Sequence, residues 1–488
     1  MGLIGILVAL ALLIGLAYRG WSVLLLAPVA ALVAALFAGD PLLAHWTQTF
    51  MGSGARFFAQ FFPIFLLGAL FGKLMDDSGS VQAIARYIGD KLGARRAILA
   101  VVIAGAGLVG LALAPALARA GLEVALVDRA PVAAPEPDPA TWDARVYAVS
   151  PGSATFLRAL GAWQRLPGDR VAPVEAMHVA GDAGATLSFS AFDLGERALA
   201  WIAEERTLRA ALLPGVFAAG VTVIGGAPFV GLTWRPDEAR LTLAPEGGTA
   251  RELSARLLVG ADGLRSWVRT ASGIVAEPRP YGQTAVVANF AVERAHHGIA
   301  RQWFRTDGSI LAWLPLPGRR VSIVWSAPEA LAAELSALPP EALAERVATA
   351  GERALGALTP LTAPAAFPLA LLKLPAMIAH RLALVGDAAH GVHPLAGQGV
   401  NLGFGDALAL AQVLAARGPV ADPGAPVLLD RYARRRAEPV LAMQTVTDGL
   451  ARLFGGGAPW LSAVRNAGLS AVDRLPLLKR ALAQPALR

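Results

Sequence analysis

The sequence predicts an α/β (α+β) protein, in which a βαβ domain with an inserted mixed β-sheet domain and C-terminal helices follows an all-α segment of about three helices. Long apolar runs fill the first 75 residues. A glycine-rich turn at residues 105–110 lies between a short apolar strand and a helix-forming run. Two further corners, at residues 262–263 and 386–387, pair glycine with aspartate after an apolar strand. The chain of 488 residues is long enough for two or three domains.

Composition excludes several kinds of site. The chain has no cysteine, so disulfides, thiolate metal sites and iron–sulfur clusters are excluded. The net charge is +7, but no basic stripe of the kind that binds nucleic acid is present, and we expect no nucleic-acid partner. His390 and His393 have no third ligand nearby in the sequence, so no metal is expected either.

Residues 1–96 read as a transmembrane segment. The apolar stretches 3–17, 21–38 and 57–74 approach the ~20 residues that cross a bilayer. Arg19 lies between the first two and five basic residues lie between Lys73 and Arg96, whereas residues 39–55 contain no Lys or Arg. The positive-inside rule then predicts the inner (cytoplasmic) membrane, with everything after residue 75 in the cytoplasm. Buried helices of a soluble protein are the alternative.

Three pieces of this segment, at residues 45–53, 60–75 and 77–80, resemble the start of the gluconate:proton symporter family. The resemblance covers about residues 1–100 and then stops. Such permeases need many more spans, and no uncharged apolar run of 18 or more residues follows residue 100. We therefore expect an anchor or a fusion rather than a transporter.

The βαβ pattern begins at residue 97. Gly105 permits a tight turn, Gly107 lets the backbone approach a pyrophosphate, and Gly110 allows close packing of helix against strand. The helix N-terminus directs free N–H groups at that phosphate. Asp128 ends the second strand and is placed to bind ribose hydroxyls. The pattern predicts a Rossmann-like dinucleotide site without choosing between FAD and NAD.

Two later motifs resemble those of the para-hydroxybenzoate-hydroxylase superfamily. The first, at residues 257–269, contains Asp262 and Gly263; the second, at residues 381–403, contains Gly386 and Asp387. The resemblance implies that Asp387 holds the ribityl chain of FAD. It also implies that Asp262 and Gly263 shape the site shared by the FAD pyrophosphate and the incoming nicotinamide nucleotide.

The loop after Asp387 supplies the remaining candidates for the flavin site. A helix beginning near Gly399 and Asn401 would direct N–H groups at the negative charge of reduced flavin, and Gly397 and Gly399 let the backbone come close. Pro394 fixes a rigid turn beside the ring. The candidate catalytic residues of this flavin-site loop are Pro394, His393 and Gly397, although packing explains the two loop histidines, His390 and His393, better than acid–base or metal chemistry does.

Finer resemblance points to the ubiquinone-biosynthesis branch of FAD-dependent hydroxylases and covers nearly all of residues 98–488. Residues 143–153 look like the family segment whose arginine, here Arg145, approaches the flavin. Residues 201–208 are similar to the segment that places an arginine, here Arg206, on the cofactor. The tail pieces 447–454 and 465–469 also match.

The resemblance implies an FAD monooxygenase that uses NAD(P)H and O₂ to hydroxylate a polyprenyl-phenol ring in ubiquinone biosynthesis. The substrate would dwell in the membrane, so lipid and other ubiquinone-biosynthesis proteins are expected partners. Apolar residues of the inserted sheet either exclude water or are plain core: Trp303, Phe304, Trp313 and Leu314. The amphipathic C-terminal stretch touches lipid or a partner, or caps the core.

The predicted domains are residues 1–96, a symporter-like transmembrane fragment; 97–440, an FAD-binding domain (97–170, 200–275 and 375–440) with a substrate domain (171–199 and 276–374); and 441–488, a helical region. Two alternatives for the function remain open. One is a flavin-dependent dehydrogenase on the same fold. The other is a truncated permease fragment that carries a passenger flavin domain.

Overall fold

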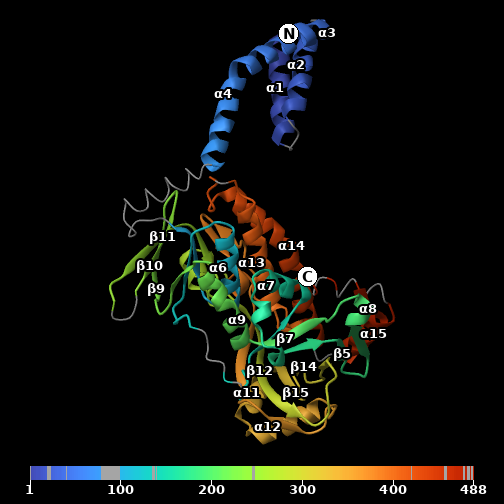
Figure 1. The fold of residues 1–488 in the computed structure, drawn as a ribbon. Helices are drawn as coiled ribbons and strands as arrows, with labels where there is room; N and C mark the ends of the chain where they lie inside the picture. Colours follow the sequence, from blue (N-terminus) through green and yellow to red (C-terminus); the bar gives the residue numbers. More distant parts are fainter. Residues whose placement is uncertain are drawn as a thin grey trace. The chain divides into compact units, whose positions relative to one another are not determined.

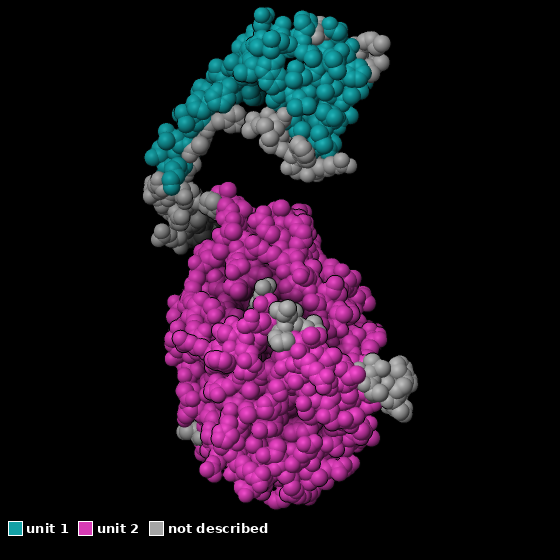
Figure 2. All heavy atoms as spheres, turned by 90° about the vertical axis from the view of Figure 1, so that its right-hand side faces the viewer, with its two compact units in different colours: residues 1–97 teal, residues 98–488 magenta. Residues whose placement is uncertain are grey.

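The computed structural model describes residues 2–18, 23–39, 41–77, 99–133, 138, 140–244, 248–418, 420–455, 459–475, 479–480, 484 and 487. The chain divides into two compact units, residues 1–97 and residues 98–488 (Figure 2). Arg19 and the basic residues from Arg86 to Arg96, on which the predicted orientation rests, lie outside the described residues. This division does not separate domains within residues 98–488, so the limits given above for those domains stay a prediction.

The first unit is entirely helical where it is described, which confirms the all-α prediction (Figure 1). Its elements are α1 (Gly2–Tyr18), α2 (Val23–Ala38), α3 (Leu42–Ala44), the π-helical η1 (His45–Phe50) and α4 (Met51–Asp77). Of the helices described, none combines the length and apolar character that a membrane span requires, so the predicted transmembrane segment is not supported.

The second unit is built on a sheet with a parallel centre. Strands β19, β11, β1, β2 and β8 lie in that order and run parallel, while β18, β10 and β9 add antiparallel edges. The bounds of these strands are β1 (Leu99–Ala104), β2 (Val124–Val127), β8 (Thr222–Ile224), β9 (Phe229–Trp234), β10 (Ala239–Leu243), β11 (Arg251–Gly260), β18 (Ile378–Ala379) and β19 (Leu382–Leu384).

Both faces of this sheet are covered, which explains the continuous apolar run of β1. Val101 and Ile103 pack in the core under the helices, whereas Val102 and Ala104 belong to a second core on the other face. The helices of the unit are α6 (Leu108–Arg119), α7 (Pro151–Ala159), α8 (Ala191–Leu194), α9 (Glu205–Ala218), α10 (Trp267–Ala271), α11 (Glu329–Ala337), α12 (Pro340–Ala350), α13 (Gly399–Ala415), α14 (Pro426–Gly455) and α15 (Pro459–Arg474). Four short 3₁₀ turns are η2 (Trp163–Arg165), η3 (Gly168–Arg170), η4 (Gly386–Ala388) and η5 (Leu395–Gly397).

A second eight-stranded sheet forms the inserted part, in the order β16-β12-β15-β14-β13-β5-β6, with β17 beside β12. Helices α11 and α12 pack against one of its faces (Figure 1). Its strands are β5 (Ala176–Ala180), β6 (Thr186–Ser190), β12 (Arg279–Val292), β13 (Ile299–Phe304), β14 (Ile310–Leu316), β15 (Arg320–Pro328), β16 (Leu358–Pro360) and β17 (Ala365–Leu371). A three-stranded sheet, β3 (Val146–Val149), β7 (Ala200–Glu204) and β4 (Val171–Val174), contacts β14.

Candidate active site

The glycine and aspartate corners meet at one edge of the parallel sheet. Asp128 follows β2, Gly105 follows β1, Asp262 follows β11 and Asp387 follows β19, and these four strands are neighbours in the sheet. In sheets of this kind ligands bind outside the carboxyl ends of the strands. All four residues line a single cavity of about 1980 Å³. The corners that the sequence places far apart therefore share one site.

The turn after β1 has the geometry of a phosphate cradle. Gly105 has a φ of 118°, and a Cβ at this position would overlap the backbone of Ala261 at the end of β11. Gly107 is different, because no heavy atom of the described residues lies within 4 Å of where its Cβ would be. A Cβ on Gly110 would overlap the Gly105 carbonyl oxygen, so this glycine packs the helix onto the turn and does not line the cavity. Arg209 on α9 donates to the carbonyl oxygen of Ala106 at 2.9 Å.

Asp128 and Asp262 hold the loops that surround this cradle. The Asp128 carboxylate accepts hydrogen bonds from the backbone N–H groups of Ala106, at 2.6 Å, and Ala130, at 2.8 Å. The Asp262 carboxylate accepts from the Ser266 hydroxyl and, at 3.1 Å, from the backbone of Val268. Both aspartates line the cavity and also shape its edge by binding backbone groups.

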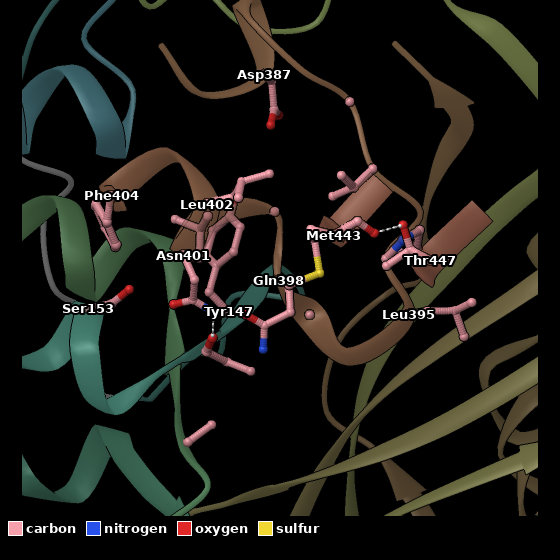
Figure 3. Close-up of a pocket in the computed structure, with 18 of the residues that line it drawn as sticks. Tyr147, Ser153, Asp387, Leu395, Gln398, Asn401, Leu402, Phe404, Met443 and Thr447 are labelled. Atoms are coloured by element: carbon pink, nitrogen blue, oxygen red, sulfur yellow. Dashed lines mark hydrogen bonds between the residues drawn. The ribbon is translucent and has the colours of Figure 1, made fainter. Parts of the chain in front are cut away.

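Asp387 is exposed to the cavity, between the buried residues Gly386 and Ala388. Its carboxylate points towards the start of α13 (Figure 3). Burial raises the pKa of Asp387, although His390 and Arg145 oppose this effect. Arg145 also lines the cavity, forms a 3.0 Å ion pair with Glu205, and stacks over Phe367 at 5.3 Å. Burial alone would lower the pKa of Arg145, but the surrounding acidic groups raise it, so the guanidinium stays charged.

The start of α13 forms the opposite side of the cavity. Within the described part of the chain, no side chain caps the first turn of this helix, whose residues Gly399 and Asn401 line the cavity. The amide side chain of Asn401 accepts from Ser150 N–H at 2.9 Å and donates to the Ala148 carbonyl at 2.8 Å. It thereby fixes the helix start against the end of β3. A helix N-terminus held in this way suits an electron-rich ligand.

A buried charge network supports the Gly386–Asp387 corner from behind, and sequence reasoning missed it. Asp406 on α13 accepts hydrogen bonds from Gly386 N–H at 2.8 Å, His390 Nε2 at 2.6 Å and Arg436 Nε at 2.6 Å. Burial opposes ionisation of Asp406, but these partners outweigh it and lower the pKa. The hydrogen bond between His390 and Asp406 is consistent with the predicted packing role of His390. The 30-residue separation of Asp406 and Arg436 left no local pattern that could have revealed the pair.

Besides Gly110, two predicted site residues, His393 and Arg206, do not line the cavity. His393 is enclosed between Gln283, whose Oε1 lies 3.1 Å from Nε2, and the Tyr281 ring, whose centroid is 4.9 Å away. Arg206 binds Thr141 and pairs with Glu204 at 3.2 Å, so it holds the loop before Arg145 instead of reaching the cavity. Of the two α9 arginines, Arg209, one helical turn later, lines the cavity. Pro394 and Gly397 do line it.

The second sheet supplies an apolar wall, and the strand period decides which residues belong to it. Trp303 and Trp313 point to the face covered by α11 and α12 and are core. Their neighbours Phe304 and Leu314 point to the other face and line the cavity. Each pair of adjacent residues therefore contains one core residue, Trp303 or Trp313, and one wall residue, Phe304 or Leu314. Phe454, near the end of α14, stacks on Phe304 with ring centroids 3.6 Å apart. The end of α14 therefore caps the cavity.

Comparison with known proteins assigns the family. The family model for the FAD binding domain matches residues 99–447. The ubiquinone hydroxylase UbiL of Rhodospirillum rubrum is 36% identical over 397 residues, a match that covers 80% of this chain and 90% of that protein. The chain belongs to the FAD-dependent hydroxylases of ubiquinone biosynthesis. The membership confirms FAD as the cofactor and the FAD-dependent monooxygenases as the class of enzyme.

Two further proteins are similar to this chain, one in sequence and one in solved structure. The 3-demethoxyubiquinol 3-hydroxylase of Escherichia coli is 34% identical, over 78% of this chain and 96% of its own length. The solved structure of PqsL from Pseudomonas aeruginosa, in complex with 2-aminobenzoylacetate, is 26% identical with a TM-score of 0.64. That match covers 76% of this chain and 99% of PqsL.

The N-terminal part of this hydroxylase matches a different family. The model of the GntP family permease matches residues 1–122, which confirms the second predicted resemblance. The two family matches overlap at residues 99–122. In the structure these residues form β1, the glycine turn and α6, so they serve the FAD-binding fold.

Proposed function

We propose that the protein hydroxylates the phenol ring of a polyprenylated ubiquinone precursor, with NAD(P)H and O₂ as co-substrates. The observation that carries this proposal is the continuity of one cavity from the glycine–aspartate corners to the apolar wall of the second sheet. A cofactor held at the corners would face an apolar substrate held against Phe304 and Leu314. The polyprenyl-phenol substrate is inferred from the ubiquinone hydroxylases that the chain resembles.

The chain's residues would divide the binding of FAD among them. The N–H groups at the start of α6 and the open backbone at Gly107 hold the pyrophosphate, and Asp128 accepts from ribose hydroxyls. Asp387 binds the ribityl chain, a role that suits a carboxylate exposed to the cavity. Arg145 balances negative charge near the flavin ring together with the N-terminus of α13. Bound FAD, once reduced by NAD(P)H, supplies the activation of O₂.

The protein contributes the exclusion of water beside the ring. Phe304, Leu314 and Val324 present apolar side chains to the cavity from three neighbouring strands. A dry wall of this kind would keep water away from the ring of bound FAD. Pro394 and Gly397 lie in the same lining and position the loop between this wall and α13.

We further propose that the protein works at the inner membrane with its catalytic unit in the cytoplasm, and that it meets other ubiquinone-biosynthesis proteins and lipid there. The match of residues 1–122 to a permease family supports an association with the membrane. A substrate with a polyprenyl tail would itself reside in the bilayer. Fractionation of cells into membrane and soluble parts tests this location directly.

The activity is tested with the full-length protein. The visible spectrum reports bound flavin, and NADPH oxidation is followed with and without a 2-polyprenylphenol under ¹⁸O₂. We expect flavin-bound protein, faster oxidation in the presence of the phenol, and one ¹⁸O atom in the product ring. Purified protein that is colourless and takes up no added FAD would contradict the proposal. Bound flavin without phenol-dependent turnover would favour the dehydrogenase.

Two glycine variants test the FAD cradle. Gly107→Ala adds a methyl group in open space, so we expect unchanged stability of the apoprotein and FAD binding weakened about tenfold, or ~1.4 kcal/mol. Gly105→Ala drives the new methyl group into the backbone of Ala261 and should lower the melting temperature as well. FAD titration and thermal unfolding separate the two effects. Wild-type FAD affinity in Gly107→Ala would contradict the assigned cradle.

A further inference from the structure

One face of α15 forms part of the cavity. Arg465, Gly468, Leu469 and Val472 line it, and their spacing of three, four and seven residues places them on a single side of the helix. This face belongs to the same cavity as Asp387. A ligand that enters from the flavin side can therefore extend along α15.

Gly468 lies in the middle of this face, where no packing contact requires a glycine. Among the residues that the structure describes, no heavy atom lies within 4 Å of the position that its Cβ would occupy. Glycine weakens a helix interior relative to alanine, so a glycine here needs a reason other than helix stability. Gly468 is exposed, and its missing side chain leaves open the part of the cavity that it lines, beside Leu469 and Val472, which pack against the cluster of Val179 and Leu187.

The opposite wall is apolar. Val179 on β5 and Leu187 on β6 line the cavity, and the stacked rings of Phe304 and Phe454 border the same region. Small-molecule sites usually occupy about 300–1,000 Å³, so a cavity of about 1980 Å³ has room for a second elongated ligand beside a dinucleotide. The apolar lining indicates a hydrocarbon ligand.

A buried ion pair holds α15 over this space. Arg465 and Asp182 pair with only 3% of each side chain exposed, and Asn466 donates to Asp182 at 2.6 Å. The Asn466 side-chain oxygen accepts from the backbone of Ala183 and Ala185, both at 3.3 Å, in the turn between β5 and β6. The charged group of Arg465 is thereby turned to Asp182, and the apolar residues of α15 are left to face the cavity.

We propose that the α15 face centred on Gly468, together with Val179 and Leu187, is the subsite for the isoprenoid tail of the substrate, and that the Asp182–Arg465 pair fixes the helix that closes it. This inference rests on the proposed function, because it assigns part of the same substrate. It predicts that occupancy of this subsite depends on the length of the tail and not on the phenol ring.

The test fills the open space. Gly468→Leu places a side chain in the subsite on a helical position that tolerates leucine, so the fold and the bound flavin are expected to be kept. Ala471→Leu is the matched control, since Ala471 is exposed on the same helix and does not line the cavity. The FAD-loaded full-length variants are assayed with a phenol that carries a long isoprenoid tail and with one that carries a single isoprene unit.

For Gly468→Leu we expect kcat/KM to fall at least tenfold for the long-tailed phenol and less than twofold for the short one, mostly through KM. Ala471→Leu should match the wild type with both. Equal losses with both phenols, or no loss with either, would overturn the subsite.

A binding measurement separates this inference from the activity. A polyprenyl alcohol, which has the tail but no ring, should raise the melting temperature of the wild type and of Ala471→Leu and leave that of Gly468→Leu unchanged. This result would support the subsite even if no phenol were hydroxylated. An equal shift in all three proteins, or in none, would overturn it.

Discussion

His393 illustrates how the structure changes the meaning of a single residue. The backbone N–H of Leu395 donates to its Nδ1 at 3.3 Å, so Nε2 carries the proton and donates to Gln283. The ring is fully buried. Burial lowers the pKa of His393 to about 4, although Asp448 opposes the shift. A neutral, enclosed imidazole supports the loop before Pro394 and is not exposed to a substrate.

This burial predicts a dependence of stability on pH. In the unfolded chain a histidine titrates near about 6.5, whereas folded His393 stays neutral down to about pH 4. The contribution to stability is therefore complete above about pH 6.5 and is lost as the pH falls, by ~2 kcal/mol at pH 5. Urea unfolding at pH 7.5 and pH 5 measures the loss. His393→Gln should show a smaller difference between the two pH values; an identical difference would mean that His393 is charged in the fold.

The elements of the site are tied together by a few buried polar contacts. Asp406 joins η4, α13 and α14, because it binds Gly386, lies on α13 and pairs with Arg436. Arg269 at the start of α10 donates to the carbonyl oxygens of Ala388, at 3.0 Å, and Leu264, at 2.9 Å. The corners after β11 and β19 are thus held to each other as well as to the sheet.

Removing the charge of Asp406 should therefore disturb the site and the fold together. Asp406→Asn leaves Arg436 buried without its anionic partner, and we expect a loss of about 3–5 kcal/mol in the free energy of unfolding together with weaker FAD binding. Urea unfolding and FAD titration measure both. Glu334→Gln is the control, because Glu334 and Arg346 form an exposed pair whose loss should not be measurable. A wild-type unfolding midpoint for Asp406→Asn would contradict the role of the network.

At the scale of the whole molecule, the two units have separate interiors. Each of the five hydrophobic clusters found in the described chain consists of residues from 99 onwards. The family match for FAD binding also begins at residue 99. Of the residues that the structure describes, those that line the cavity belong to the second unit. The second unit therefore contains what FAD binding needs.

We expect residues 98–488 alone to fold and to bind FAD with the affinity of the full chain. A domain with its own core folds independently as a rule. The visible spectrum and FAD titration of the purified fragment, beside the full-length protein, provide the measurement. If the full chain is yellow but the fragment, purified in the same way, is insoluble or binds no flavin, then residues 1–97 stabilise the second unit.

The sequence by itself determined the family, the cofactor and the three corners of the site. The corners are recognisable because each is local: a strand, a glycine turn and an acid at short spacing. Their convergence was predicted from the family resemblance, since the order of β19, β11, β1 and β2 that brings the corners to one edge is a tertiary property. Sequence similarity could not determine whether the apolar N-terminal helices span a bilayer.

Only the tertiary structure decided which side chains reach the cavity. The alternation along a strand separates Trp303 from Phe304, but which face is core depends on where α11 and α12 pack. Similarly, one turn of α9 separates Arg206 from Arg209, and the packing of that helix directs Arg209 to the glycine turn. Contacts between distant segments, such as Asp406 with Arg436, leave no mark in local spacing, because they form only when the elements pack.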